Sequence, residues 1–185
     1  NTASHIFDLL VSLNGDCPVA WVQAHLTHGD DLFDGTRLKE DPNGLGTLCC
    51  ENGVMFHAMN SGRGLEVEAV GDQGVVTSIQ DGKEWQVREP GGEDYRGRKV
   101  LTAGSFPDYE YRSSTLRLIE DLVHSLDTGA SPRGGIRNAY ANNELIFAFI
   151  ESHVQGGARV ALPLKESVYR LQRDRGPQQP KFERQ

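Results

Sequence analysis

The fold is decided by residues 44–88, which read GLGTLCCENGVMFHAMNSGRGLEVEAVGDQGVVTSIQDGKEWQVR. Short runs of apolar and β-branched residues alternate here with turn dipeptides such as Asn52-Gly53 and Asp81-Gly82. These dipeptides are typical of tight turns between neighbouring antiparallel strands. The stretch therefore predicts an antiparallel meander with strands over 44–51, 54–59, 64–70, 75–80 and 84–88. A polar, Gly-containing exposed loop is expected over 90–98.

Helical and further strand patterns flank the meander. Apolar residues over 6–13 form a helical stripe that ends at Asn14-Gly15, and alternation predicts a strand over 19–27. A loop is expected over 29–43, helices over 114–126 and 137–155, and a short strand over 159–162. The residues expected on the buried side of the 114–126 helix are Leu116, Ile119, Leu122, Val123 and Leu126.

Strands gathered in the middle of the chain, with helices before and after them, indicate an α+β fold. We expect an open, mostly antiparallel β-sheet with helices packed on one face. The strands carry apolar residues in both phases, as in Val54-Met55-Phe56, so the other face is expected to be partly apolar. Such a face is either an ordinary solvated surface or the contact surface of another subunit.

Composition indicates one globular domain, which we place over 1–164 with a C-terminal tail over 165–185. The 185 residues are 37% hydrophobic, and the net charge of -7 argues against nucleic acid or an anionic membrane as a partner. No stretch approaches the roughly 20 apolar residues of a membrane span. Three cysteines, two of them adjacent at Cys49-Cys50, make a poor disulfide framework and favour a reducing, cytoplasmic location. No metal is expected, since His25 and His28 lie in a predicted strand without ligand spacing.

Asn1 and His5 are the candidate site residues. They are four positions apart, so in a helix both side chains lie on one face and can address one ligand. A histidine near the start of a helix also commonly serves as a capping or core residue. The chain has no initiating Met before this pair, and we expect it to be the back portion of a longer enzyme.

Several short motifs, taken in order, carry a family resemblance. They are Asn1-x-x-x-His5 with Leu13-x-Gly15, the helix 115–122, Gly129-x-x-Pro132, and the closing run from Glu151-Ser152 through Gly156-Gly157 to Leu162-Pro163-Leu164. In this order and spacing they resemble the C-terminal domain of the Gfo/Idh/MocA oxidoreductases, the family of glucose-fructose oxidoreductase and inositol dehydrogenase. Each motif alone is weak, and their order makes the resemblance specific.

The resemblance implies a two-domain, NAD(P)-dependent oxidoreductase. The N-terminal Rossmann domain, missing here, would bind NAD or NADP and supply a catalytic Lys, so no cofactor-binding residue is expected in this chain. The chain itself would adopt the fold of the glyceraldehyde-3-phosphate dehydrogenase C-terminal domain. It would bind a sugar or polyol substrate and form a homo-oligomer through the open sheet face, and the fragment alone is expected to be inactive.

The same resemblance assigns roles to the two site residues. His5 falls on the family's catalytic, substrate-contacting histidine, and Asn1 falls on the position of an Asp. An amide can hydrogen-bond a hydroxyl but cannot take a proton. Three outcomes therefore stay open: His5 acts with the missing Lys, the enzyme performs another reaction on sugars, or it binds without turnover. The alternative function is a stand-alone sugar-binding or assembly module.

Overall fold

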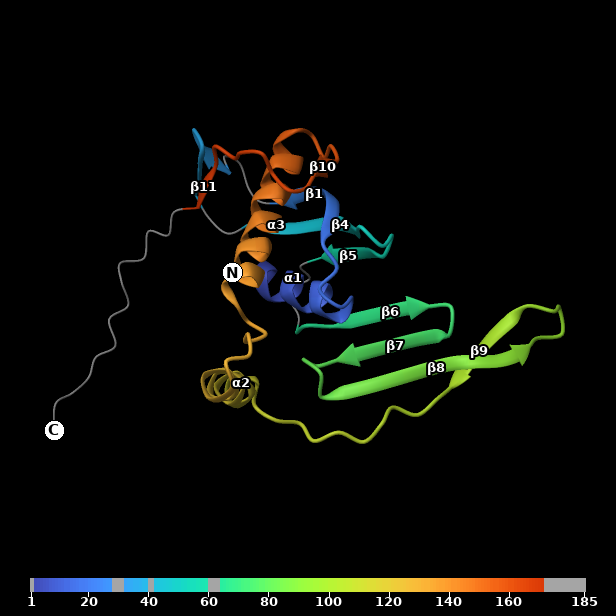
Figure 1. Cartoon of the computed structure of the whole chain (residues 1–185). Coiled ribbons are helices and arrows are strands. Elements are labelled where there is room, and N and C mark those ends of the chain that lie inside the picture. Colours follow the sequence, from blue (N-terminus) through green and yellow to red (C-terminus); the bar gives the residue numbers. More distant parts are fainter. Residues whose placement is uncertain (1, 28–31, 40–41, 60–63, 172–185) are drawn as a thin grey trace. The chain divides into compact units, whose positions relative to one another are not determined.

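A computed structural model describes residues 2–27, 32–39, 42–59 and 64–171 of the chain (Figure 1). They belong to two compact units. Unit 1 combines Asn1–Asn60 with Gly135–Gln185, and unit 2 is the continuous segment Ser61–Gly134. Each unit is described by itself.

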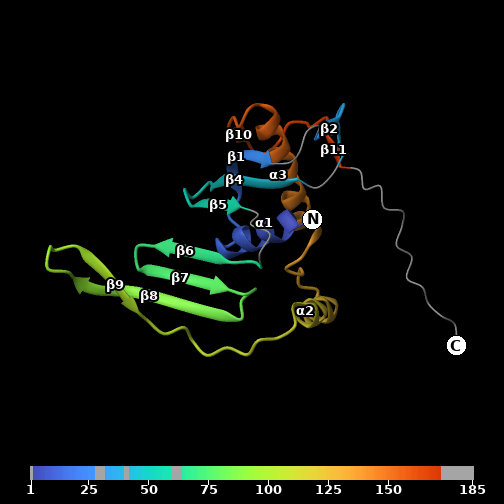
Figure 2. The ribbon, with the colours of Figure 1, turned by 180° about the vertical axis from the view of Figure 1, so that it is seen from behind.

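Unit 1 is built on a four-stranded antiparallel sheet, here called sheet A. It contains β1 (Val19–Thr27), β4 (Asn43–Cys50), β5 (Met55–Met59) and β10 (Val160–Ala161), in the order β10-β1-β4-β5. Two helices, α1 (Thr2–Leu13) and α3 (Ile136–Val154), lie beside the strands, and Figure 2 shows the arrangement from behind. The predicted helices over 6–13 and 137–155 and the strand over 19–27 are confirmed.

The core of unit 1 lies between sheet A and these two helices. Alternation along β1 places Val22 and Ala24 inward, at 0% and 1% exposure, while Gln23 between them is exposed. The core cluster of buried residues consists of Phe7, Val22, Ala24, Leu48, Leu145, Ala148, Phe149 and Val160. Burial of one amphipathic stripe from each helix therefore fixes α1 and α3 on the sheet.

Ser152, at 0% exposure near the end of α3, ties that helix to β1. Its Oγ accepts the backbone N–H of Ala24 at 2.8 Å and lies 2.6 Å from the carbonyl oxygen of Ala158. Strand β10 pairs with β1 only at Trp21 and Val22, so the serine continues the hydrogen bonding where β10 stops. Without Ser152, the backbone N–H of Ala24 would lose this partner. A buried N–H left without a partner costs about 1–3 kcal/mol of folding free energy.

A small sheet stands apart from sheet A within unit 1. It contains β2 (Phe33–Asp34), β3 (Arg37–Leu38) and β11 (Arg170–Leu171), with β11 parallel to β3. The predicted loop over 29–43 thus contains two short strands. They form because Leu38 is buried in a second apolar cluster with Leu32 and Ile150.

Unit 2 carries a second four-stranded antiparallel sheet, in consecutive order. Its strands are β6 (Val67–Gly71), β7 (Gly74–Ile79), β8 (Glu84–Glu93) and β9 (Lys99–Ala103). The prediction of an exposed loop over 90–98 is wrong, since β8 runs through Pro90 to Glu93 and pairs with β9. Pro90 is tolerated because it lies beyond Arg88, the last β8 residue paired with β7, and needs no N–H on that side.

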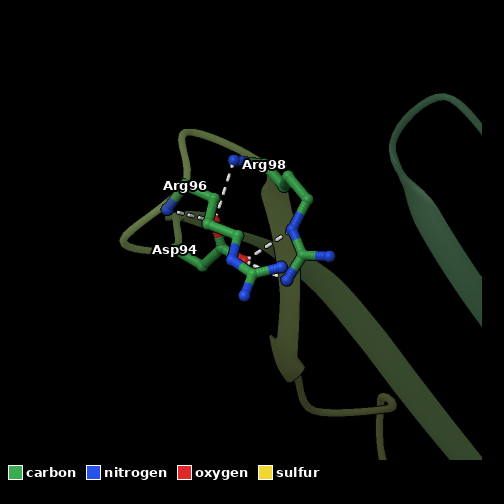
Figure 3. A network of polar contacts seen from close by, with 3 residues as sticks. All are labelled: Asp94, Arg96 and Arg98. Carbon is green, nitrogen blue, oxygen red and sulfur yellow. Dashed lines mark hydrogen bonds and ion pairs between the residues drawn. The ribbon is translucent and has the colours of Figure 1, made fainter.

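The tip of the β8–β9 hairpin is closed by Asp94 (Figure 3). Asp94 Oδ1 accepts the backbone N–H groups of Arg96 at 2.8 Å and Arg98 at 3.0 Å, and Oδ2 accepts Arg98 Nε–H at 2.8 Å. The Arg98 side chain and backbone N–H bonds to the carboxylate hold the pKa of Asp94 below its ordinary value of 3.8. Gly97, at φ +72°, supplies the left-handed residue that the turn requires.

Asp94→Asn is expected to loosen this hairpin tip, because the amide keeps an acceptor oxygen but loses the charge that Arg98 pairs with. A lowered pKa in the folded state means that the carboxylate stabilises the tip above pH 3.8, and that this stabilisation is lost as pH falls through the lowered pKa. Amide hydrogen exchange over 94–99 should therefore be faster in the variant at neutral pH. In the unmodified protein, the Asp94 carboxyl should titrate below 3.8 by NMR.

Glu110→Gln serves as the control, since it removes the carboxylate of an exposed ion pair with Arg112 elsewhere in unit 2. It should leave exchange at the hairpin tip unchanged. Equal exchange rates in Asp94→Asn and the unmodified protein would contradict the role given to Asp94.

Helix α2 (Ser114–Thr128) closes unit 2 in sequence. The Ser113 hydroxyl caps it by accepting the backbone N–H of Leu116 at 3.5 Å, and Gly129 ends it in the left-handed conformation. The prediction that its apolar stripe is buried is wrong here. The helix has no buried residue, and Leu116, Ile119, Leu122, Val123 and Leu126 are 47–77% exposed. The amphipathic pattern predicts the helix correctly, but no described element of unit 2 covers its apolar side.

The α+β class and the mostly antiparallel pairing are confirmed. The strands divide among three sheets, and the placement of one domain over 1–164 stays a prediction. Residues 172–185 of the predicted tail lie outside the described residues, as does Asn1. No described helix is long and apolar enough to cross a membrane.

Candidate functional site

The predicted site lies on the first turn of α1. His5 is exposed there, and the structure describes no hydrogen bond or ion pair between it and another residue of the described ranges. The helix beneath it is firmly held, because Phe7 and Leu10 are 2% and 8% exposed. An accessible imidazole on a well-anchored helix is able to meet a ligand. Its expected partner, Asn1, lies outside the described residues.

Asp8, one turn further along α1, has a structural contact. Its carboxylate accepts a hydrogen bond from Asn142 Nδ2 at 2.8 Å, and Asn142 is only 8% exposed on α3. This bond links the two helices and occupies one oxygen of the only acidic side chain of α1. No contact among the described residues therefore holds a carboxylate next to His5.

A mostly apolar cavity of about 200 Å³ opens beside the first two turns of α1. Its wall is drawn from α1, α3, sheet A and the segments around β3 and β11. The lining residues are Ala3, Ile6, Phe7, Leu26, Leu38, Pro42, Asn43, Gly44, Ala58, Met59, Ile146, Phe149, Ile150 and Leu171. His5 is absent from this wall, although Ala3, Ile6 and Phe7 surround it in sequence.

Phe149 shapes this cavity from the side of α3. Its ring lies 4.8 Å from that of Phe7, centroid to centroid, and it rests directly on the backbone of β4 at Gly46. A Cβ at Gly46 would come within 2.6 Å of the Phe149 ring and 2.8 Å of the carbonyl oxygen of Gln23. Gly46 is therefore needed for the close approach of helix and strand.

The lining residues determine what the cavity can do. Among the described residues of its wall there is no titratable side chain, and the amide of Asn43 is the polar side chain. The cavity can accommodate an apolar group of a small molecule. Proton transfer would have to come from side chains other than the described lining residues.

Sequence reasoning missed most of this wall, because its members come from segments far apart along the chain. The sequence places Phe149 in the predicted helix over 137–155 but does not indicate what its ring contacts. The available signal for Gly46 was its position as an isolated glycine inside a strand, which indicates close backbone approach.

The face of sheet A that points away from α1 and α3 is partly apolar, as expected. Leu45, Met55 and Met59 are 46%, 50% and 70% exposed on β4 and β5. Arg159 stacks on Trp21, with its guanidinium carbon 3.8 Å from the ring centroid. Exposed apolar side chains on two neighbouring strands make this face a possible contact surface.

No group of three or more His, Cys, Asp or Glu side chains among the described residues is placed to hold a metal ion. His25 packs its ring against Gly157. His28 lies outside the described residues.

No protein-family model and no curated protein matches the chain. Solved structures do match. The WlbA dehydrogenase from Bordetella pertussis, in complex with NADH and UDP-GlcNAcA, has 20% identity and a TM-score of 0.58 over 89% of this chain and 44% of its own. The aldose-aldose oxidoreductase from Caulobacter crescentus, complexed with glycerol, has 16% identity and a TM-score of 0.63 over 86% of this chain and 46% of its own.

A super-repressor mutant of Gal80p from Saccharomyces cerevisiae also matches, with 14% identity and a TM-score of 0.55 over 88% of this chain and 49% of its own. The chain thus spans about half the length of the solved chains it matches. The resemblance of the motifs to oxidoreductases of Gfo/Idh/MocA type is confirmed at the level of the fold.

Proposed function

We propose that this chain is the substrate-binding and oligomerisation domain of an NAD(P)-dependent oxidoreductase that acts on a sugar, a polyol or a related hydroxy compound. The observation that carries the proposal is the exposed position of His5 on the anchored first turn of α1, in a fold shared with solved oxidoreductases. The substrate class follows the resemblance. It is supported by the match to an aldose-aldose oxidoreductase and to a dehydrogenase in complex with UDP-GlcNAcA.

The residues of this chain act on the substrate side of the reaction. The nicotinamide, bound by a domain outside this chain, supplies the acceptor for the hydride that leaves the carbinol carbon. His5 takes the hydroxyl proton, and Asn1 donates or accepts a hydrogen bond to hold a substrate hydroxyl in place.

The partly apolar face of sheet A is proposed as the homo-oligomer contact. Exposed Leu45, Met55 and Met59 would be buried against the same face of a second subunit, as in self-complementary two-fold interfaces. A cytoplasmic location stays a prediction that rests on the cysteine pattern.

The test is a fluorescence titration of the full-length native protein with NAD(H) and NADP(H), together with its intact mass. The proposal expects a dissociation constant on the order of micromolar for one of the cofactors. It also expects a native chain roughly twice as long as these 185 residues. A protein that binds neither cofactor would overturn the oxidoreductase proposal.

The second candidate is a binding or assembly module without turnover. It is favoured by the match to the super-repressor mutant of Gal80p, and by Asn1 at the position of an acid. Cofactor binding without oxidation of any sugar or polyol in a substrate screen would favour this candidate.

A further inference from the structure

The connection between α1 and β1 is docked on the end of β4. The backbone N–H of Glu51 donates to the carbonyl oxygen of Pro18 at 2.9 Å, and Val19 is the register partner of Cys50. The side-chain amides of Asn14 and Asn52 exchange two hydrogen bonds, of 3.3 and 3.0 Å. These contacts bring Cys17, which precedes Pro18, beside Cys50, the last residue of β4.

The two thiols differ in accessibility. Cys17 is partly exposed, whereas Cys50 is 2% exposed and faces the helices. The Cys17 thiol lies 3.9 Å from the carbonyl oxygen of Pro18, the same oxygen that accepts the backbone N–H of Glu51 next to Cys50. Cys49, the neighbour of Cys50 in the strand, points to the opposite face of sheet A, so only one of the adjacent cysteines can meet Cys17.

We propose that Cys17 and Cys50 are a reversible thiol–disulfide site, which in its oxidised form fastens the C-terminal end of α1 to β4. This inference is independent of the proposed oxidoreductase activity. The sequence predicts a poor disulfide framework, and all three cysteines are free in this structure. The proposed pair joins two residues that are 33 positions apart in the chain. A reversible pair is compatible with a reducing compartment, where disulfides are transient.

The oxidation requires a low-molecular-weight disulfide, RSSR, as the oxidant. The Cys17 thiolate attacks one sulfur of RSSR, which forms a Cys17–S–S–R mixed disulfide and releases one thiolate RS⁻. The Cys50 thiolate then attacks Sγ of Cys17, forms the Cys17–Cys50 bond and releases the second RS⁻. Two protein thiols are oxidised, RSSR is reduced to two RSH, and the two thiol protons end on the released thiolates.

Accessibility sets the order of these two steps. Cys17 is the thiol that an external reagent reaches, and its neighbours Asp16 and Pro18 line an open cavity of about 310 Å³ together with Glu51. Burial raises the pKa of the Cys50 thiol, so closure of the disulfide is the slower step and should accelerate as pH rises.

The experiment oxidises the full-length protein with glutathione disulfide and then maps its cysteines after alkylation. Cys49 and Cys50 fall in one peptide, so serine variants identify the partner. The unmodified protein and Cys49→Ser should both give a peptide linked to Cys17, while Cys17→Ser and Cys50→Ser should give none. Dithiothreitol should restore the free thiols. The oxidised protein and oxidised Cys49→Ser should melt roughly 5–10 °C higher than their reduced forms, and Cys17→Ser should show no such shift.

Three results would overturn the proposal. All three thiols of the chain could remain open to alkylation, Cys17 could stop at the glutathione adduct, or the link could form through Cys49. If Cys50→Ser fails to fold because Cys50 is buried, Cys17→Ser still decides, because Cys17 is partly exposed and its replacement leaves the core intact.

Discussion

Replacing His5 with alanine is expected to lower kcat of the full-length enzyme by roughly 10²- to 10⁴-fold, the contribution of a positioned acid–base group. The proposed role of His5 is to take the hydroxyl proton as hydride leaves the substrate carbon. Asn1 cannot replace it, since an amide does not accept a proton. The measurement is steady-state oxidation of the substrate found by screening sugars and polyols, at a saturating concentration of the preferred cofactor.

Two controls separate this role from a structural one. His5 is exposed and has no polar partner in the described part of the chain, so His5→Ala should leave the melting temperature and cofactor affinity unchanged. Ser12→Ala, at an exposed position of the same helix, should retain full kcat. Full activity in His5→Ala would remove His5 from the mechanism. If the unmodified protein binds neither cofactor, the oxidoreductase proposal itself is refuted.

Replacing Phe149 with alanine is expected to lower the free energy of unfolding by about 3–5 kcal/mol, as for other buried phenylalanines. Phe149 is 7% exposed, packs against Phe7, and rests on the β4 backbone at Gly46. The glycine cannot fill the space that the ring leaves, so the site collapses poorly. Urea denaturation of the unmodified and variant proteins measures the loss.

Tyr140→Ala is the matched control for this core prediction. Tyr140 is an aromatic residue of the same helix but is 70% exposed, so its replacement should change the unfolding free energy by no more than about 0.5 kcal/mol. A loss below about 1 kcal/mol in Phe149→Ala would contradict the view that this ring joins α1, α3 and sheet A.

Strands and helices with strong local patterns were predictable from sequence. The 19–27 strand was predicted with the bounds that β1 has, because alternation and a flanking Pro18 mark it. The prediction for β8 was wrong because Pro90 and two glycines are typical of a loop. A strand tolerates proline where the neighbouring strand needs no backbone N–H at that position. That information lies in the pairing of β7 and β8 and is absent from residues 90–98 alone.

Prediction of the site was limited in the same way. His5 could be singled out because it forms a four-residue pair with Asn1 and carries the family resemblance. Ser152 belongs to one of the motifs that carry the resemblance. Its hydrogen bond with Ala24 could not be predicted, because the two residues are 128 positions apart in the chain. The cavity and the Cys17–Cys50 pair depend on which segments the fold brings together, and local patterns do not encode such contacts.

Unit 2 interrupts unit 1 in sequence, and this has a consequence for synthesis on the ribosome. All strands of unit 2 pair with their immediate neighbours along the chain, so its sheet can form as soon as it emerges. Sheet A must wait, because Leu145, Ala148 and Phe149 of α3 are translated only after all of unit 2. During that interval Val22 and Leu48 have no helix α3 to cover them. The nascent chain therefore carries an incomplete core, the kind of surface that chaperones recognise.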